Sequence, residues 1–351
     1  MRIKKLLAFI CFIAILISSL CSCSQTSNEP EKRAVSYYDF FDTVSVIISY
    51  KGDSPEEFSE NSETVRAILE DYHRMFDIYY EYSGINNLRT INKNAGKEPV
   101  KVDSRLIEFL LYAKEIYTLT NGKTNIAMGS VLKLWHDERE NGIYDPESAA
   151  IPNESQLLAA SEHTDINNII IDIEASTVYL ADPLMRLDVG AIGKGYATER
   201  AAQALIDSGV TSYVLNIGGN IRIIGEKHDS SGWITGITNP DKSSDKSFAC
   251  RIEIKDTSIV TSGDYERYYF VGDVKYHHII DPETNMPANY FASVSVITPD
   301  SALADALSTA LFCMNYEDGL SLVKSIGGVE VIWIKHNSQI LKTDNIELIS
   351  D

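Results

Sequence analysis

The chain has 351 residues and a formal net charge of −19, from 31 basic and 50 acidic side chains. An acidic surplus repels the phosphate backbone of nucleic acids and argues against DNA or RNA as a partner. The length suffices for one large domain or two modest ones, and no linker rich in Pro, Gly or Ser divides it. We therefore expect one continuous domain over residues 35–351.

The first 22 residues have the pattern of an export signal. Basic residues precede an apolar run from Leu6 to Ile17, which is too short to span a bilayer comfortably. The signal then ends in Leu20-Cys21-Ser22-Cys23, which resembles a bacterial lipobox and predicts cleavage before Cys23 and lipidation of its thiol. Residues 23–34 then form a predicted lipid-bearing tether. This places the protein outside the cytoplasm, anchored to the bacterial cell membrane; the alternative is a plain cleaved signal with incidental cysteines.

Two cysteines remain in the predicted domain. Cys250 opens an alternating apolar run and Cys313 lies in an apolar helix, so both are interpreted as core thiols. A disulfide between them is left open, because an exported protein could form one. No CxxC pair offers a zinc site.

Helices and strands follow in blocks that do not alternate strictly. Ser54, Pro55 and Glu57 have the hydroxyl, proline and glutamate that begin a helix. Further helices are predicted over residues 104–120, 195–208 and 302–314, and strands over residues 44–49, 169–173, 213–217, 293–298 and 329–335. Residues 137–154, with an Asn-Gly and an Asp-Pro pair, predict a surface loop. The blocks favour an α+β fold with mixed or antiparallel sheets and packed helices.

Three glycines, a carboxylate and a lysine mark a strand-to-helix turn at Asp188–Tyr196. A helix beginning near Gly195 would present free backbone N–H groups to an anion, with Lys194 as a neutralising charge. The spacing fits neither a Walker loop nor a dinucleotide fingerprint. A close-packed turn without a ligand is the competing explanation for the glycines.

Asp305, Ser308 and Thr309 lie one turn apart on a single face of a predicted helix. A carboxylate and two hydroxyls are hard oxygen ligands, which favour magnesium over zinc. The alternative is that both hydroxyls bond to carbonyls of their own helix, with the aspartate as a cap.

The adjacent histidines His277 and His278 would point to opposite faces of a strand, so only one can face a site. We favour His278 as that group and interpret His277 as a packing or surface residue. Together the three motifs predict a phosphate-bearing ligand, a hard metal ion and a titratable group, as phosphoryl or nucleotidyl transfer requires.

The order of these motifs resembles the FAD:protein FMN transferases, the ApbE flavin transferase family. The resemblance rests on Phe41-Asp42-Thr43 and on residues 188–199 (DVGAIGKGYATE), 216–220 (NIGGN), 261–267 (TSGDYER), 277–282 (HHIIDP) and 304–310 (ADALSTA). It implies an ApbE-like fold and an exported enzyme, often a lipoprotein. Such an enzyme uses Mg²⁺ to split FAD, passes FMN to a Thr or Ser hydroxyl of a partner protein and releases AMP.

The resemblance also implies roles for individual residues. The metal ligands are the carbonyl of Ala191 and the side chains of Asp305, Ser308 and Thr309, and His278 accepts the proton of the attacking hydroxyl. The flavin nucleotide contacts are Phe41, Tyr79, Asp188, Lys194, Ile279 and the segment Lys123-Thr124-Asn125. That segment follows Gly122 where the family usually has Gly-Ala-Phe-Asp, so an amide replaces a carboxylate and an aromatic ring is lost.

Two other functions remain compatible with the sequence. An FAD pyrophosphatase would use the same metal and lysine with water in place of the protein hydroxyl. A flavin-binding or solute-binding lipoprotein without activity would need neither Asp305 nor Thr309. For the transferase, the expected acceptor is a membrane redox complex subunit with an extracytoplasmic domain.

Overall fold

The computed structural model describes residues 32–50, 52–227 and 229–349, and residues 32–351 form one compact unit. The predicted signal peptide, Cys23 and most of the predicted tether lie outside the described residues. Strand β1 begins at Arg33, so the last two residues assigned to the tether belong to the folded domain, where Ala34 pairs with Ile48. None of the described helices combines the length and the apolar character that a membrane crossing requires.

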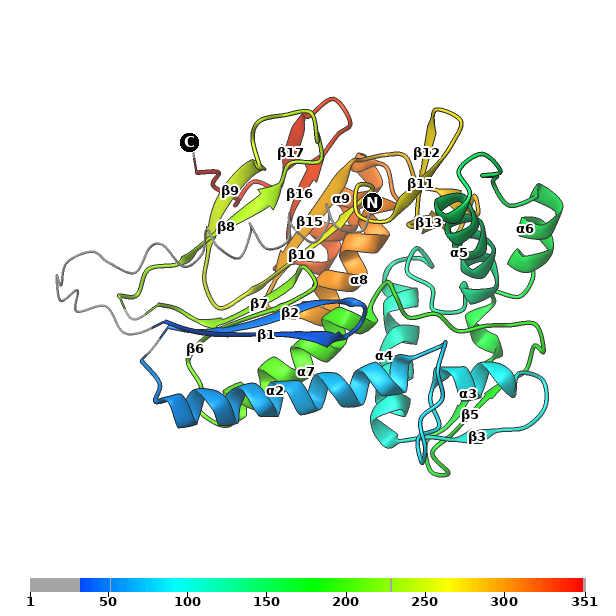
Figure 1. Ribbon diagram of the computed structural model, residues 1–351, viewed down its shortest axis with the longest axis horizontal. Coiled ribbons are helices and arrows are strands. Elements are labelled where there is room, and N and C mark those ends of the chain that lie inside the picture. The colour runs from blue at the N-terminus through cyan, green and yellow to red at the C-terminus, as the bar shows by residue number, and fades with distance from the viewer. Residues whose placement is uncertain (1–31, 51, 228, 350–351) are drawn as a thin grey trace, which may run out of the picture. The chain divides into compact units, whose positions relative to one another are not determined.

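An eight-stranded sheet forms the centre of the described chain (Figure 1). Every neighbouring pair in it is antiparallel, which confirms the predicted α+β class. Its order is β1 (Arg33–Phe40), β2 (Thr43–Ser49), β6 (Ser212–Ile217), β7 (Asn220–Gly225), β10 (Ser258–Gly263), β15 (Ser293–Thr298), β16 (Glu330–Ile334) and β17 (Ile340–Lys342).

Both faces of this sheet are covered. Helices α2 (Pro55–Phe76) and α7 (Gly193–Asp207) run beneath β1, β2 and β6 (Figure 1), and α8 (Ser301–Phe312) packs on β10 and β15. In β6, Tyr213 and Leu215 face the helices, whereas Val214 faces a second cluster around Trp233. Strands buried on two faces can be apolar at successive positions, as β6 is from Tyr213 to Leu215. Strand β15 is also buried throughout, but it alternates serine and valine from Ser293 to Val296.

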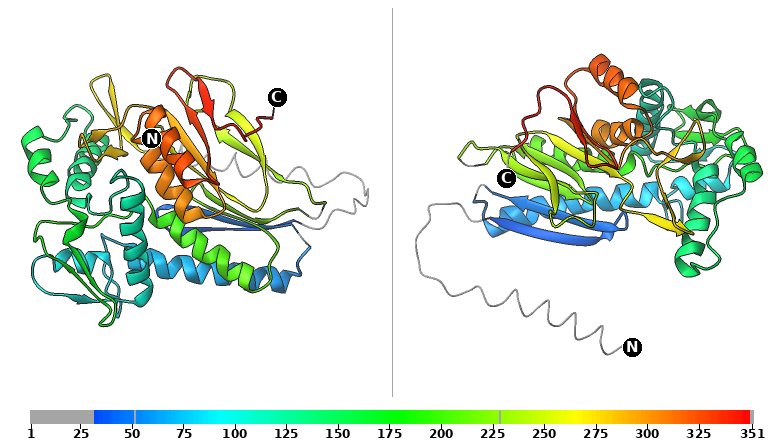
Figure 2. Two further views of the ribbon diagram at one scale, coloured as in Figure 1. Left: turned by 180° about the vertical axis from the view of Figure 1, so that it is seen from behind. Right: turned by 90° about the horizontal axis from the view of Figure 1, so that it is seen from above.

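Smaller elements surround this core, and Figure 2 shows them from two further directions. The helices are α3 (Leu88–Lys93), α4 (Ser104–Leu119), α5 (Gly129–Tyr144), α6 (Glu154–Ser161), the 3-10 turn η1 (Ile166–Asn168) and α9 (Tyr316–Ile326). The strands are β3 (Val100–Lys101), β4 (Ile169–Asp172), β5 (Thr177–Leu180), β8 (Trp233–Thr238), β9 (Phe248–Ile254), β11 (Tyr268–Val271), β12 (Val274–His277), β13 (Ile280–Asp281) and β14 (Met286–Pro287).

Local sequence signals explain where the helices begin and end. Ser54 and Glu57 form the reciprocal capping box that starts α2. After α4, Asn121 and Gly122 have positive φ, and the Gly122 N–H donates to the Tyr117 carbonyl at 2.8 Å. The predicted helix start at Ser54 and the predicted helix over residues 104–120 are confirmed.

The predicted loop over residues 137–154 is wrong at its start, because α5 continues to Tyr144. Gly142, interpreted as a turn residue, is buried inside this helix, where an added Cβ would lie 2.7 Å from Tyr269 Cδ2. The glycine therefore allows β11 to pack closely on α5.

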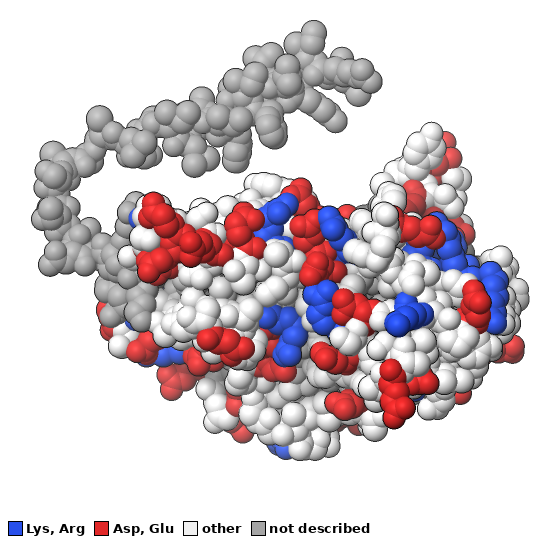
Figure 3. Space-filling model, turned by 90° about the horizontal axis from the view of Figure 1, so that it is seen from below, with Lys and Arg blue, Asp and Glu red and all other residues white. Residues whose placement is uncertain are grey.

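Only one of the two predicted core thiols is fully buried, because Cys250 is half-buried at the edge of the core. Cys250 and Cys313 are both free thiols, and Cys313 is buried. Acidic and basic side chains are interspersed over the face that Figure 3 displays.

Helices α7 and α8 approach most closely at Gly195. An added Cβ there would lie 2.3 Å from both Asp305 Cβ and the Ser301 carbonyl oxygen. At Gly193 the nearest atoms are side-chain carbons of Phe76 and Val189, at 3.1 and 3.2 Å.

We expect Gly195→Ala to lower the free energy of unfolding by about 1–3 kcal/mol, because the methyl group must push two helices apart. Gly193→Ala is the matched control and should cost less, since the side chains it meets can shift. Urea unfolding measures both. Wild-type stability in Gly195→Ala would contradict the close helix crossing.

Candidate active site

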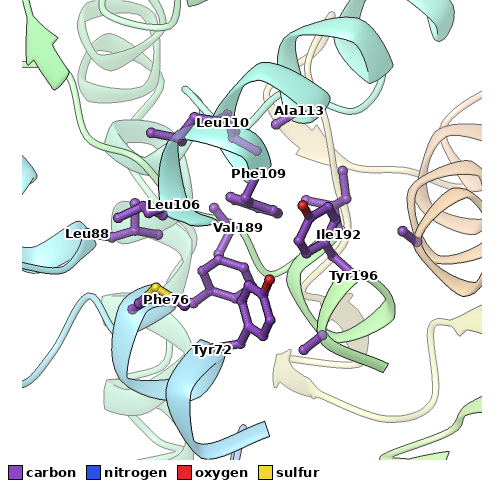
Figure 4. Close-up of a cluster of buried hydrophobic side chains, with 14 of the residues drawn as sticks. Tyr72, Phe76, Leu88, Leu106, Phe109, Leu110, Ala113, Val189, Ile192 and Tyr196 are labelled. Carbon is purple, nitrogen blue, oxygen red and sulfur yellow. The ribbon is translucent and has the colours of Figure 1, made fainter. Parts of the chain in front are cut away.

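The glycine-rich turn before α7 divides its residues between the core and the site. Val189, Ile192 and Tyr196 are buried, and Figure 4 shows them packed with Phe76 and Phe109. Three residues predicted to contact ligands follow one another at intervals of three positions: Asp188, Ala191 and Lys194. All three are partly exposed. The buried side chains therefore anchor the turn and leave the other three facing outward.

Asp188 is held in place by hydrogen bonds from neighbouring segments. The side chain of Asn92 accepts from the Leu187 N–H at 2.7 Å and donates to the Leu187 carbonyl at 3.0 Å. The Asp188 N–H donates to the Ile126 carbonyl at 2.9 Å. Shielding by the surrounding protein raises the pKa of the Asp188 carboxyl, while the Gly190 N–H and the Arg267 cation oppose that rise.

Asp305 reaches from α8 to the start of α7. Its Oδ2 accepts the Gly195 N–H at 2.7 Å, and the side chain is nearly buried, at 4% exposure. Helix α7 begins at Gly193 with Ile192 as its N-cap, so the Gly195 N–H is one of the first N–H groups that have no acceptor within the helix. Asp305 accepts this N–H, and the Ala191 carbonyl, which precedes the N-cap, lies outside the helix's own ladder of hydrogen bonds.

The two predicted hydroxyl ligands lie one turn further along α8. The Ser262 hydroxyl of β10 lies 2.8 Å from Ser308 Oγ and 3.5 Å from Thr309 Oγ1. Ser308 also donates to the Asp305 carbonyl at 2.9 Å, so the bonding of a hydroxyl to its own helix, left open by the sequence, does occur there. Ser262 lies in the 261–267 motif, but only the pairing of β10 beside α8 identifies it as part of the site.

These donors fit a hard divalent cation. Burial raises the pKa of Asp305, opposed by the Lys194 cation and the Gly195 N–H, and the carboxyl forms no ion pair within the described residues. A buried carboxylate without a cationic partner is stabilised by a bound metal ion. Within the described chain no three His, Cys, Asp or Glu side chains converge, so the hydroxyls and the Ala191 carbonyl would complete the ligand set.

The expectation of a free anion-binding helix start is wrong for two of the amides. The Gly193 N–H donates to the Val189 carbonyl at 2.8 Å, and the Gly195 N–H is taken by Asp305. The Gly193 bond is local to the turn, whereas the Gly195 bond arises from the close helix crossing, which brings the Asp305 carboxylate to the start of α7. Lys194, whose ammonium forms no ion pair among the described residues, is then the positive group available to a phosphate.

His277 and His278 divide as strand geometry predicts. His277 is 7% exposed, donates from Nε2 to the Ala288 carbonyl at 2.7 Å and packs on Phe312. His278 is partly exposed, and its Nδ1 lies 3.2 Å from the Arg267 carbonyl. Because a carbonyl only accepts, Nδ1 carries the proton and Nε2 keeps a free lone pair.

Arg267 is a site residue to which sequence reasoning assigned no role. Its carbonyl oxygen lies 3.2 Å from His278 Nδ1, and the charge of its guanidinium acts on the pKa of Asp188, Asp305 and His278. The hairpin register could have indicated it: Tyr268 pairs with His277, which places Arg267 opposite His278. Predicting the β11–β12 hairpin from the sequence would therefore also predict that Arg267 lies opposite His278.

Phe41 and Tyr79 lie on two separate turns. Phe41 and Asp42 form the two-residue link between β1 and β2, with φ of 53° and 52°. Left-handed backbone costs a non-glycine residue roughly 1–2 kcal/mol, and strain of this kind concentrates at functional sites. Tyr79 is half-exposed, and the charges of Asp188 and Arg267 act on its pKa, which burial raises. Tyr79 therefore lies near the same groups as His278.

The segment Lys123-Thr124-Asn125 is engaged within the protein. Lys123 pairs with Asp281 at 2.9 Å and Glu283 at 3.1 Å, and Asn125 donates to the Thr164 carbonyl at 2.9 Å. Lys123 and Asn125 line a cavity of about 350 Å³ that includes none of Asp188, Lys194 and Asp305.

Two further predicted contacts have buried side chains. Thr124 is 1% exposed, and its hydroxyl donates to the Ala306 carbonyl of α8 at 2.8 Å, so it ties the loop to that helix. Ile279 is 6% exposed and packs in the core around α8.

Fold and site together define an α+β domain that unites a buried carboxylate, hydroxyls, an unpaired lysine and a histidine with a free ring nitrogen. This set is typical of enzymes that act on phosphate-bearing substrates.

Comparisons with known proteins agree. A profile of the ApbE family matches residues 41–333. The FAD:protein FMN transferase of Treponema pallidum (strain Nichols) is 31% identical over 337 residues, covering 92% of this chain and 90% of that protein. The FAD:protein FMN transferase of Klebsiella pneumoniae (strain 342) is 29% identical, covering 76% of this chain and 83% of that protein.

Solved structures show the same relationship. The crystal structure of the ApbE protein from Thermotoga maritima aligns with a TM-score of 0.77 at 28% identity, covering 90% of this chain and 97% of that one. The flavin transferase ApbE from Vibrio cholerae aligns with a TM-score of 0.74 at 26% identity, covering 89% and 96%. The chain belongs to the ApbE family, and it is an enzyme of that family.

Proposed function

We propose that this enzyme transfers FMN from FAD to a Thr or Ser hydroxyl of an extracytoplasmic acceptor protein and releases AMP, with Mg²⁺ bound at the Asp305 site. The observation that carries the proposal is the bond between the Gly195 N–H and Asp305 Oδ2. It puts a buried carboxylate, the Ala191 carbonyl and the Lys194 ammonium at the same end of α7, beside Thr309.

Binding of the FAD diphosphate follows from the charges at this end of α7. Lys194 and Arg267 form no ion pair within the described chain, so both cations are available to phosphate oxygens. The metal ligands would be Asp305, Ser308, Thr309 and the Ala191 carbonyl, and the ion would supply positive charge to the diphosphate as AMP leaves. Asp188 is held rigidly through Asn92 and Ile126, which suits a residue that positions the substrate.

The transfer replaces one phosphorus–oxygen bond by another. The acceptor hydroxyl oxygen attacks the phosphorus on the riboflavin side of FAD, and the bond from that phosphorus to the bridging oxygen breaks, so AMP leaves with the bridging oxygen. The hydroxyl proton passes to Nε2 of His278, because Nδ1 is already protonated and bonded to the Arg267 carbonyl.

Location and partner complete the proposal. The export signal at residues 1–22 and the lipobox before Cys23 support a lipid-anchored enzyme outside the cytoplasm, although both lie outside the described residues. The acceptor would be a flavinylated subunit of a membrane redox complex. The interspersed charges of Figure 3 offer no continuous basic face for nucleic acid on the side shown.

Transfer should depend on His278 in its neutral form. Burial, then the Arg267, His277 and Arg139 charges, lower the pKa of His278 well below 6.5. The imidazole therefore stays neutral as the pH falls through 6.5, and we expect kcat/KM to remain flat there and to drop only at more acid pH. A fall in kcat/KM that already begins at pH 6.5 or above would contradict this environment of His278.

Replacing His278 with Ala should reduce transfer by about 10²–10⁴-fold, the usual contribution of a general base. FAD binding should persist, because the diphosphate contacts are untouched. Turnover equal to that of the wild type would remove His278 from the mechanism.

Mg²⁺ should stabilise the folded protein, because an ion that binds only the folded state adds about 2.7 kcal/mol at 100 times its Kd. Thermal unfolding with and without Mg²⁺ at constant ionic strength measures this shift. Asp305→Asn should abolish the shift, whereas Asp344→Asn, at an exposed aspartate, should keep it. A shift retained in Asp305→Asn would place the ion elsewhere.

A threonine-containing acceptor peptide tests the reaction itself. The peptide is incubated with FAD and the enzyme, with and without Mg²⁺, and analysed by mass spectrometry. We expect the mass of FMN on the peptide only with Mg²⁺. Free FMN and AMP with unmodified peptide would indicate a pyrophosphatase, and bound but unchanged FAD would indicate a flavin-binding lipoprotein.

A further inference from the structure

The last turn of α2 is connected by hydrogen bonds to both aromatic residues assigned to the flavin. His73 and Asp77 are four residues apart, so they lie on one face of the helix end. His73 Nδ1 accepts the Phe41 N–H at 3.3 Å. Asp77 Oδ1 accepts the N–H groups of Tyr79 at 2.6 Å and Tyr80 at 2.9 Å.

Tyr82 joins these two halves. Its hydroxyl donates to Asp77 Oδ2 at 2.7 Å and lies 3.5 Å from His73 Nε2. Because His73 Nδ1 accepts from Phe41, the ring proton is on Nε2 and points toward Tyr82. Burial, followed by the bond to Asp77, raises the pKa of Tyr82 to about 12, so the phenol keeps its proton and donates.

The helix that carries this network is rigid. Leu69, Tyr72, Met75 and Phe76 are all buried along the same last turns of α2. Asp77 itself is only 9% exposed and caps the helix end. The network is therefore a fixed link from the core to the two turns.

The network holds Phe41 in a backbone conformation that costs free energy and Tyr79 with its side chain exposed. Phe41 has a left-handed backbone where a hairpin link of two residues ordinarily uses Asn-Gly. The His73 ring contacts the Phe41 ring edge-on at 5.5 Å, so both its backbone and its side chain are held. Tyr79 keeps 51% of its surface exposed, as expected for an aromatic side chain presented to a ligand.

We propose that His73 and Asp77 are positioning residues for the flavin ring. His73 holds Phe41 and Asp77 holds Tyr79 in the arrangement that receives the isoalloxazine, and Tyr82 links His73 to Asp77. This inference rests on the proposed function, in which both aromatic residues contact the flavin. A site held in its binding geometry before the ligand arrives loses less conformational entropy on binding. The network would therefore contribute to flavin affinity and not to the phosphoryl chemistry.

Three variants and one control test this role in the full-length enzyme. His73→Phe keeps a ring on Phe41 but removes the acceptor, and His73→Asn restores an acceptor near the Nδ1 position. Tyr82→Phe removes only the link between the two halves. Tyr80→Phe is the control, because Tyr80 is 71% exposed and its hydroxyl takes no part in the network.

The measurements are KM and kcat for FAD and the Kd values of FMN and AMP, of which only FMN carries the ring. We expect His73→Phe to raise KM for FAD and Kd for FMN about tenfold, the effect of one lost buried hydrogen bond. Kd for AMP and kcat should change less than about threefold, because the diphosphate contacts are intact. His73→Asn should recover most of the loss, Tyr82→Phe should show a smaller loss and Tyr80→Phe none.

Unchanged FMN affinity in His73→Phe, or equal weakening of FMN and AMP, would overturn the positioning role while leaving the proposed transfer intact. If His73→Phe does not fold, Tyr82→Phe decides by the same two criteria. A wild-type enzyme that binds AMP but neither FAD nor FMN would refute the proposed function, and this inference with it.

Discussion

The close approach of α7 and α8 at Gly195 is the constraint on which the site depends. Only a hydrogen atom fits between the two helices there, because an added Cβ would lie 2.3 Å from Asp305 Cβ. The same closeness lets Asp305 accept the Gly195 N–H, which has no acceptor within α7, just after the Ala191 carbonyl. Further bonds hold α8 in this place, from Thr124 to the Ala306 carbonyl and from the Ser301 N–H to Glu199. Packing and ligand geometry therefore have one origin.

Around this crossing, local patterns in several distant segments orient the side chains of the candidate site. Asp188, Ala191 and Lys194 stay partly exposed because Val189, Ile192 and Tyr196 beside them are anchored in the core (Figure 4). The β11–β12 hairpin puts Arg267 opposite His278, which selects the ring nitrogen that can accept a proton. The end of α2 holds the strained turn at Phe41. Each device is local, and the main sheet with its helices brings them to one place.

The glycine-rich turn and the paired histidines show how much of the candidate site can be predicted from residue patterns. The packing explanation of the glycine-rich turn holds at Gly195, whereas the ligand contacts expected of Asp188, Ala191 and Lys194 stay a prediction. The expected anion-binding amides are wrong because Asp305 occupies one of them, a contact between residues 110 positions apart. His277 is buried and His278 is partly exposed, as alternation along a strand predicts, although β12 ends at His277. That His278 faces a ligand stays a prediction.

The sequence by itself determined the α+β class, the helix ends with capping signals and the family, because these follow from periodicity, local hydrogen bonding and ordered motifs. It placed Asp305, Ser308 and Thr309 on one face for the same reason. Only the tertiary structure decided that Asp305 meets Gly195, that Ser262 lies beside Ser308, that Gly142 packs against Tyr269 and that the side chains of Thr124 and Ile279 are buried. Those outcomes depend on which surfaces pack together, and packing between distant segments leaves no periodic trace in the chain.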